Sequence, residues 1–366
     1  MKKMQQYKVK GKRVYVGIDV SKRKYSLNVR SEGMMVAQLT IPADYEVLGN
    51  YFRNNYPECT IIAIYEAGFC GFGLHDYLSG EGITCIVTPP TSVTVEKIDK
   101  KKCDKRDAAR LARNLENGDY KTCEVPDKER LLDRLHSRTL EQVQKDITRE
   151  KNRIRRFFDF YDLNGKNTSE RWFVSDWQAA RKLSQDEGPI GESLRLHFEH
   201  LDLLLRQRRE LRRALLKISR KPRYRHAVEI LSSMSGVGEM SAIRMVLEWG
   251  EDWSRFANAG RVASYSGLTS CEFSTGDEQF RGSITGQSRG VVRATLIQCA
   301  WMAIRVDPVL RQKYLRVWRN SGSKKKAIVA VARKMVVRMR AILLSGREYQ
   351  VGLIEECREK KVKVKI

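Results

Sequence analysis

The sequence predicts an α/β domain followed by a largely helical region. Two patterns lead to this fold class. Strand-like and helix-like segments alternate up to Pro89, whereas apolar residues recur at helical spacing from Asp127 onward. A third observation is charge, because 69 Lys and Arg residues face 44 Asp and Glu residues in this 366-residue chain, giving a net charge of +25. Such an excess predicts an acidic partner, and phosphate backbones are the commonest one.

The composition excludes several other classes of protein. Hydrophobic residues make up 42% of the chain, and 25 Gly and 8 Pro are too few for a disordered or collagen-like protein. No apolar run approaches the roughly 18 residues that a membrane-spanning helix needs, and the basic residues 1–13 lack the apolar core of a signal peptide. The eight cysteines include no CxxC pair, which indicates reduced thiols. We therefore expect a cytoplasmic protein with no membrane partner.

Seven segments make up the predicted α/β domain. They are strands at residues 14–20, 25–29, 35–41, 60–66 and 83–88, and helices at 44–56 and 71–78. Short connections make the first three strands an antiparallel meander, and the almost wholly apolar fourth strand is typical of one covered on both faces. A strand-helix-strand crossover follows, and Pro89 ends the last strand. With one further helix, this order describes an RNase H-like α/β layer.

Two long helices are predicted next, at residues 127–164 and 192–220. The first stretch contains neither Gly nor Pro, and both stretches carry apolar residues at helical spacing. On the first helix these residues are Leu132, Leu135, Val143, Ile147, Ile154 and Phe157. Two such helices predict either an antiparallel hairpin or the coiled-coil arm of a dimer.

The last third of the chain is predicted to be mostly helical. In LSSMSGVGEMSA, two short helices join through a turn at Gly236 and Gly238. This helix-hairpin-helix-like segment either presents backbone amides to a phosphate or is an ordinary turn between helices. Residues 264–290 are loop-rich, and helices are expected at 291–304 and, with a strongly basic composition, at 323–344.

Four carboxylates form the first candidate site. Side chains alternate along a strand, so Asp19 shares one face of the first strand with Gly17, while Glu66 ends the fourth strand. Asp104 and Asp107 are three residues apart and share one face of a helix. Such oxygen ligands suit Mg²⁺ (or Mn²⁺), and two ions can stabilise the entering and leaving oxygens of phosphoryl transfer. The alternative is that Asp104 and Asp107 pair with neighbouring lysines or cap a helix.

A hydroxyl-rich loop forms the second candidate site. Ser274 and Thr275 lie between the segments SYSGL and RGSITGQSRG, where small residues and arginines suit the close approach of a phosphodiester. Attack of either hydroxyl on phosphorus forms a covalent phosphoester intermediate. Tyr265 is a competing nucleophile, and a turn or capping role is the ordinary alternative for a serine in such a loop.

Basic residues cluster in further segments and predict contacts with nucleic acid, with a solvated charged surface as the alternative. With the two glycines of the turn, the predicted contact residues are Arg206, Arg208, Arg209, Arg212, Arg213, Lys217, Arg220, Lys221, Gly236, Gly238, Arg281, Arg289, Arg293, Lys324, Lys325, Lys326, Arg333 and Lys334. This spread suits a protein that holds several nucleic acids at once, and it predicts binding that weakens steeply with salt.

Six motifs resemble, in the right order, those of one enzyme family. They are VYVGIDVSK, IYEAGFCGFGL, KCDKRDAARLA, LSSMSGVGEMSA, SYSGL and STGDEQFRGSIT, within a similarity that covers residues 14–346. The chain is similar to the DEDD-class transposases of the insertion-sequence one-hundred-and-ten family, whose characterised relatives are bridge-RNA-guided recombinases. The resemblance assigns the four metal ligands to Asp19, Glu66, Asp104 and Asp107.

The resemblance also implies a division of the chain. The expected parts are a basic arm at 1–12, a RuvC-like DEDD domain at 13–122, a coiled-coil helical linker at 123–226, a C-terminal transposase domain with the nucleophile loop at 227–346, and a basic tail at 347–366. In the family the nucleophilic serine directly precedes a glycine, and that position here is Thr275. Ser274 lies one residue earlier and is slightly favoured, because a primary hydroxyl is less hindered.

The partners implied by the resemblance are donor and target double-stranded DNA, a structured non-coding bridge RNA, and further copies of the chain in a homo-oligomer, from dimer to tetramer. A prokaryotic, nucleoid-associated transposase that cuts and rejoins DNA is therefore expected. Two rival functions remain open. A junction-resolving metal nuclease needs the acidic tetrad but not the loop hydroxyl, and a non-enzymatic RNA-binding protein needs neither.

Overall fold

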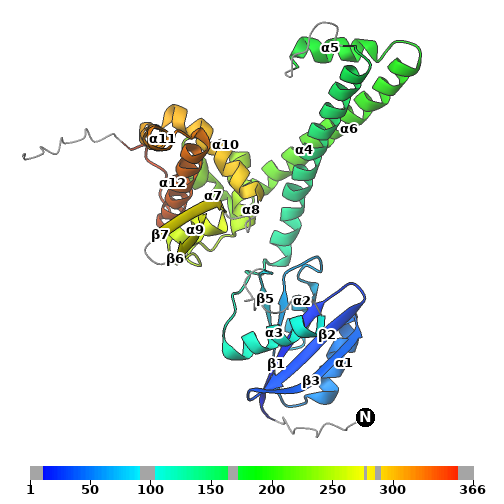
Figure 1. Ribbon diagram of the computed structural model, residues 1–366, viewed down its shortest axis with the longest axis vertical. Coiled ribbons are helices and arrows are strands. Elements are labelled where there is room, and N and C mark those ends of the chain that lie inside the picture. The colour runs from blue at the N-terminus through cyan, green and yellow to red at the C-terminus, as the bar shows by residue number, and fades with distance from the viewer. Residues whose placement is uncertain (1–10, 91–103, 164–171, 276–277, 285–289, 353–366) are drawn as a thin grey trace, which may run out of the picture. The chain divides into compact units, whose positions relative to one another are not determined.

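The structure is a computed structural model that describes residues 11–90, 104–163, 172–275, 278–284 and 290–352, without the side chains of residues 272–281. It divides into two compact units, Met1–Pro126 and Asp127–Ile366 (Figure 1). None of the helices in these described ranges is long and apolar enough to cross a membrane. The finer division of the chain into five parts stays a prediction.

A five-stranded mixed sheet with the order β3-β2-β1-β4-β5 forms the centre of the first unit (Figure 1). Its strands are β1 (Arg13–Val20), β2 (Lys24–Ser31), β3 (Met34–Pro42), β4 (Thr60–Glu66) and β5 (Thr84–Thr88). β1, β2 and β3 pair antiparallel, whereas β4 runs parallel to β1 and β5 runs parallel to β4. The predicted meander, crossover and RNase H-like order are confirmed.

Helices cover both faces of this sheet. They are α1 (Tyr45–Asn55), α2 (Gly73–Gly80) and α3 (Asp104–Asn117). α1 and α2 share a hydrophobic core with Val14, Val16 and Ile18 of β1. On the opposite face, Leu111 of α3 packs against Ile64 of β4.

Gly17 marks the point where α3 comes closest to the sheet. A Cβ atom on this residue would lie 2.1 Å from the carbonyl oxygen of Ala108 and 2.4 Å from the nitrogen of Ala112, so only glycine allows the approach. Gly17 and Asp19 therefore belong to the face of β1 that α3 covers, as strand alternation predicts. The missing side chain at Gly17 fixes how near the first turn of α3 lies to the end of β1.

The second unit begins with a helical hairpin. It consists of α4 (Lys128–Phe160), α5 (Val174–Leu183) and α6 (Pro189–Ser219), and α4 and α6 pack along each other (Figure 1). Val143, Ile147 and Ile154 of α4 are buried with Leu194 and Phe198 of α6. Of the two predicted alternatives, the antiparallel hairpin is the one present within the chain.

Two residues of the predicted apolar stripe on α4 lie on the wrong face. Leu132 and Leu135 are 62% and 56% exposed, whereas Arg130, Asp133 and Ser137 are buried. The buried stripe therefore continues to the start of α4 at helical spacing, but with polar residues. The expectation that leucines mark the buried face fails here because this end of α4 is held by ion pairs.

Eight further elements follow α6. They are α7 (Pro222–Ser232), α8 (Glu239–Trp249), α9 (Ala259–Tyr265), β6 (Ser270–Thr275), β7 (Glu278–Ile284), α10 (Gly290–Val306), α11 (Pro308–Ser321) and α12 (Lys324–Ser345). α12 packs against α7, α9, α10 and α11, around buried Trp249 and Met335. The largely helical character is confirmed. Residues 264–290, predicted as loop, contain a two-stranded antiparallel hairpin of β6 and β7.

Candidate active site

The first two carboxylates of the candidate site lie at neighbouring strand ends. In the parallel pair of β1 and β4, Ile18 is opposite Tyr65. Asp19 and Glu66 are the next residues of these two strands, and Glu66 is the last residue of β4. The register therefore brings Asp19 and Glu66 to the same edge of the sheet, as the sequence predicts.

The other two carboxylates lie in the first turn of α3. Asp104 and Asp107 precede Ala108, the residue whose backbone lies against Gly17 of β1. Because Gly17 is two residues from Asp19 on the same face of the strand, this first turn lies at the edge where β1 and β4 end. The sheet and the helix thus bring the predicted tetrad into one region of the first unit.

Two cationic side chains contact this tetrad. Nη2 of Arg110 lies 3.1 Å from Oδ1 of Asp107 and 3.6 Å from Oε1 of Glu66. Nζ of Lys24, the first residue of β2, lies 2.8 Å from Oδ2 of Asp104. One guanidinium nitrogen therefore bridges carboxylates from β4 and α3. Sequence reasoning missed Arg110, although its position three residues after Asp107 on the same helix is the signal that points to it.

The donor set suits a hard divalent cation in its chemistry, because all four ligands are carboxylates. The bridging nitrogen of Arg110 marks a position where a positive charge is held by two of them. Within the part of the chain that the structure describes, however, no three Asp, Glu, His or Cys residues are close enough to hold a metal ion together.

The candidate nucleophiles lie in the second unit, at one end of the β6–β7 hairpin. Ser274 is opposite Gln279, and Thr275 is opposite Glu278. Thr275 is the last residue of β6, directly before residues 276–277, which lie outside the described ranges. The backbone thus places both hydroxyl residues at the end of β6, where it pairs with the start of β7.

The predicted nucleic-acid contacts fall into several structural settings. The α6 residues Arg206, Arg209, Arg212 and Arg213 are exposed, as are Lys217, Arg220, Lys324, Lys325, Lys326 and Arg333. Arg293 donates to the carbonyl oxygen of Gly267 over 3.3 Å. Arg289 and the side chain of Arg281 lie outside what the structure describes.

The turn between α7 and α8 depends on its first glycine for packing. Gly236 has φ of +82°, and a Cβ on it would lie 2.5 Å from the carbonyl oxygen of Cys299 in α10. Gly238 has an ordinary φ of −93°, and no atom lies within 4 Å of its Cβ position. The helix-hairpin-helix-like shape is present, and the close approach at Gly236 is to the protein's own helix.

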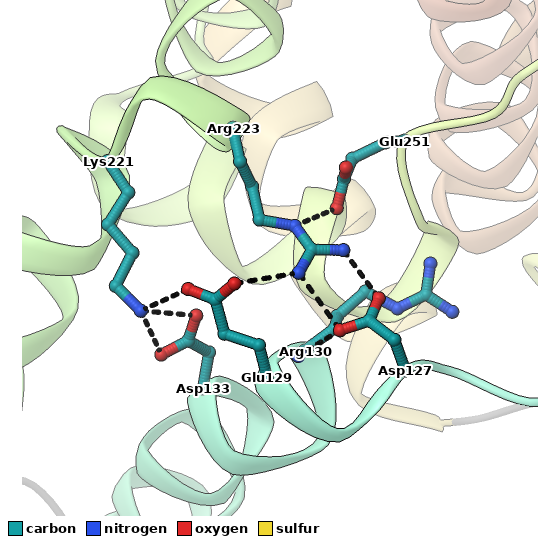
Figure 2. Close-up of polar contacts among 7 residues, drawn as sticks. All are labelled: Asp127, Glu129, Arg130, Asp133, Lys221, Arg223 and Glu251. Atoms are coloured by element: carbon teal, nitrogen blue, oxygen red, sulfur yellow. Dashed lines mark hydrogen bonds and ion pairs between the residues drawn. The ribbon is translucent and has the colours of Figure 1, made fainter.

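Lys221, a predicted nucleic-acid contact, is held by carboxylates of α4 (Figure 2). Its ammonium nitrogen lies 2.9 Å from both carboxylate oxygens of Asp133 and 3.0 Å from Oε1 of Glu129. These hydrogen bonds raise the pKa of Lys221. The carboxylates of α4 therefore balance its charge, and these ion pairs connect the start of α7 to the start of α4.

Arg223 extends the same ionic network, as Figure 2 shows. Its guanidinium donates to both oxygens of Asp127, over 2.9 and 2.5 Å, and to Glu251 over 2.6 Å. Asp127 also caps α4 by accepting from the backbone nitrogen of Arg130. The hydrogen bonds from Arg223 hold the pKa of Asp127 well below its usual range. Sequence reasoning missed this network because its partners are distant in the chain, with Arg223 lying 96 residues from Asp127 and 94 from Glu129.

Comparisons with known proteins agree with this arrangement. The model described as the transposase IS116/IS110/IS902 family matches residues 228–315, and the model of the IS110-type DEDD transposase domain matches residues 16–162. The second match contains all four carboxylates, and the first contains Ser274 and Thr275.

Three curated relatives match over much of their length. The transposase for insertion sequence element IS1533 of Leptospira borgpetersenii is 26% identical over 65% of this chain and 70% of its own. Two proteins of Sinorhizobium fredii named as transposases are similar as well. One, y4qE, is 24% identical over 94% of this chain and 86% of its own, and y4rJ is 28% identical over 75% of each. With both family models in their expected order on an RNase H-like sheet and a helical C-terminal region, the chain belongs to the IS116/IS110/IS902 family of transposases, enzymes that cleave and transfer DNA strands.

Proposed function

We propose that this transposase cuts DNA through a covalent Ser274 or Thr275 intermediate, assisted by the acidic tetrad and guided by a structured non-coding RNA. The observation that carries the proposal is the meeting of Asp19 and Glu66 at adjacent strand ends with the acidic first turn of α3. A DEDD transposase domain generally implies catalysis with a divalent metal, and this is the region of the first unit that offers oxygen ligands from three elements.

Asp19, Glu66, Asp104 and Asp107 would hold Mg²⁺ or Mn²⁺. When bound, such ions stabilise negative charge on the entering and leaving oxygens of phosphoryl transfer. The protein's own contribution is to present the carboxylates on rigid elements and to keep them neutralised beforehand. Arg110 does this for Glu66 and Asp107.

The hydroxyl of Ser274 or Thr275 attacks phosphorus in one DNA strand. A bond forms between the side-chain oxygen and phosphorus, the bond from phosphorus to one sugar oxygen breaks, and that oxygen leaves with a proton in place of the one lost by the hydroxyl. Attack of a second strand's hydroxyl on the phosphoester reverses these changes and rejoins the strands. Because the phosphoester conserves the energy of the broken bond, strand exchange needs no external energy source.

The guide RNA and the homo-oligomer follow from the resemblance, and the charge of the chain supports them. The net charge of +25 is larger than one duplex contact requires, and the exposed arginines of α6 lie far along the chain from the basic start of α12. Several nucleic acids held at once would use such separate basic surfaces. We further propose that the tetrad of one copy acts with the hydroxyl of another.

Covalent protein–DNA adducts test the nucleophile. Purified transposase, RNA transcribed from the non-coding DNA of the element, and labelled donor DNA are incubated with Mg²⁺ and separated under denaturing conditions. Ser274→Ala or Thr275→Ala should abolish the adduct, and the other substitution should leave it. Adducts that survive both changes together would refute the loop assignment. Cleavage without adducts in the double variant would instead identify a stand-alone nuclease.

Two further arms test the guide RNA and the oligomer. Without the RNA, adducts on the donor DNA should disappear, and adducts that form equally well without it would refute guidance. Asp19→Asn and Ser274→Ala proteins should each be inactive alone but should restore adducts when mixed, provided that Ser274 is the nucleophile. If mixing restores nothing, both residues act within one copy.

A further inference from the structure

We propose that Trp301 and Trp318 form a stacking platform for unpaired RNA bases on the surface of α10 and α11. The platform, as we use the name, consists of Trp301, Tyr314 and Trp318. It rests on the proposed function, because it supplies a site for the guide RNA, but it concerns residues that neither the motifs nor the comparisons assign.

The three rings form a row across two helices. The ring centroids of Trp301 and Tyr314 are 5.7 Å apart, and those of Tyr314 and Trp318 are 6.1 Å apart. Tyr314 is buried, whereas Trp301 and Trp318 are 41% and 38% exposed. The buried tyrosine thus contacts both indoles, and each indole presents part of its surface to solvent. An exposed, rigidly held indole is the side chain on which a nucleobase stacks best.

The segment that carries these rings is strongly basic. Residues 301–326 contain eight Lys and Arg residues and one acidic residue, Asp307. Asp307 is buried, accepts a hydrogen bond from Tyr349 over 2.5 Å and lies 3.6 Å from Arg338, so one carboxylate is shared among several cations. Nζ of Lys324 lies 5.4 Å from the centre of the Trp318 ring. Aromatic rings with cations nearby suit a nucleotide strand, because its bases stack on the rings and the cations neutralise its phosphates.

Lys334 of α12 gives a further sign of excess positive charge. Burial lowers the pKa of Lys334, and the nearby positive charges of Arg338, Lys313 and Arg316 lower it further, with a smaller opposing effect from Asp307. Two of these neighbours, Lys313 and Arg316, belong to α11, the helix that carries Tyr314 and Trp318. An anion placed on this side of α11 would relieve the repulsion, and a phosphate backbone brings such anions in a row.

Unpaired RNA is the occupant that fits best. In duplex DNA the bases are stacked inside the helix, so their faces are closed to a flat indole. Loops of a structured RNA instead offer splayed bases, the usual targets of aromatic side chains in RNA-binding proteins. Met302 and Val306, which are 52% and 66% exposed, add further exposed apolar surface to α10. A protein partner could use the same apolar surface, but the eight cations favour a polyanion.

Binding of a 15-nucleotide oligouridylate to the full-length protein tests the platform. Fluorescence anisotropy of the labelled strand should give a dissociation constant about tenfold higher for Trp318→Ala and for Trp301→Ala. Trp318→Phe, which keeps a stacking ring, should bind within about threefold of the wild type. The tryptophan variants should keep the salt dependence, whereas Lys324→Gln with Lys325→Gln should lower its log–log slope by about 1.4.

Phe173→Ala is the matched control, because Phe173, the residue directly before α5, is an aromatic residue that is 58% exposed. It should bind the strand as the wild type does. Wild-type affinity in both tryptophan variants would overturn the proposal, as would equal losses for Phe173→Ala. If Trp318→Ala changes the oligomeric state but not the affinity for RNA, the surface binds protein, and the proposal is wrong.

Two further probes separate the nucleic-acid sources. The affinity for a 15-base-pair DNA duplex should be unchanged by Trp318→Ala. Oligothymidylate should bind more weakly than oligouridylate. Thymidylate binding as tight as uridylate would assign the platform to displaced DNA strands and overturn the RNA assignment. Because these measurements use no guide RNA, they stand apart from the proposed function. Guide-independent DNA cleavage would refute the guidance and leave the binding result unaffected.

Discussion

The close approach of α3 to β1 makes Gly17 the position where a single methyl group should disturb the acidic site most. In Gly17→Ala, the new Cβ would start 2.1 Å from the Ala108 oxygen and 2.4 Å from the Ala112 nitrogen. Both are backbone atoms, so no side chain can rotate out of the way. To reach an ordinary contact of 3.4 Å, α3 has to move away from the sheet by about 1.3 Å.

Two consequences follow from that displacement. Overpacking of this kind costs about 1–3 kcal/mol of the free energy of unfolding. Asp104 and Asp107 move with α3 away from Asp19 and Glu66, and a misplacement of about 1 Å lowers the rate of a positioned reaction by about 100-fold. Adduct formation should therefore fall by about two orders of magnitude at a temperature where the variant remains folded.

Urea unfolding followed by circular dichroism, together with the adduct assay, measures both effects. Gly80→Ala is the matched control, because Gly80 ends α2 in the same unit and no atom lies within 4 Å of its Cβ position. It should leave activity unchanged and stability unchanged or higher by up to about 1 kcal/mol. Wild-type stability and activity in Gly17→Ala would refute the packing of α3 described above.

Four other predictions follow from the second unit and the carboxylates. Arg223→Ala should lower the free energy of unfolding by about 1–2 kcal/mol in urea titrations, after allowance for solvent screening. The depressed pKa of Asp127 stabilises the folded state at pH values above the ordinary Asp pKa of 3.8, and this stabilisation is lost as the pH falls from 3.8 towards the lower folded-state pKa. Asp127→Asn should therefore flatten the acid side of a stability–pH profile, and an unchanged acid side would contradict this. Leu132→Gln should change stability by less than about 0.5 kcal/mol, whereas Ile147→Ala should cost about 2–4 kcal/mol, and equal effects would place Leu132 in a buried face. EDTA should abolish adducts and Mn²⁺ should restore them in wild type but not in Asp19→Asn; adducts that persist in EDTA argue against a metal.

The sheet and the acidic residues were predictable because each rests on a local pattern. Alternation along residues 14–20 separates the valines from Asp19, and the apolar run 60–66 ends at Glu66. The neighbourhood of the two strand ends then follows from the crossover topology. None of these steps needs knowledge of a contact between distant side chains. The position of α3 is the exception, because the close approach at Gly17 that explains it is visible only in the structure.

The start of α4 and the β6–β7 hairpin were not predictable in the same way. The buried face of α4 at Arg130 and Asp133 is polar because Lys221 of a later segment pairs with Asp133, and the sequence pattern does not reveal such a partner. The hairpin strands are six and seven residues long and contain four Ser and Thr residues, so they resemble a loop locally. Pairing between Phe273 and Phe280 across the turn, rather than strand propensity, defines them.

The ionic network at the start of α4 has a mechanical consequence. α4 has 33 residues, so it is about 50 Å long. Arg223 and Lys221 hold its first turns, and Arg134 binds Glu248 of α8 over 2.9 Å. A rotation of about 5° at this fixed end would displace the far end of the hairpin by about 4 Å, a distance set by the length of the helix. A small change in the geometry of these ion pairs thus produces a large displacement at the other end of the hairpin, and their stiffness limits that displacement.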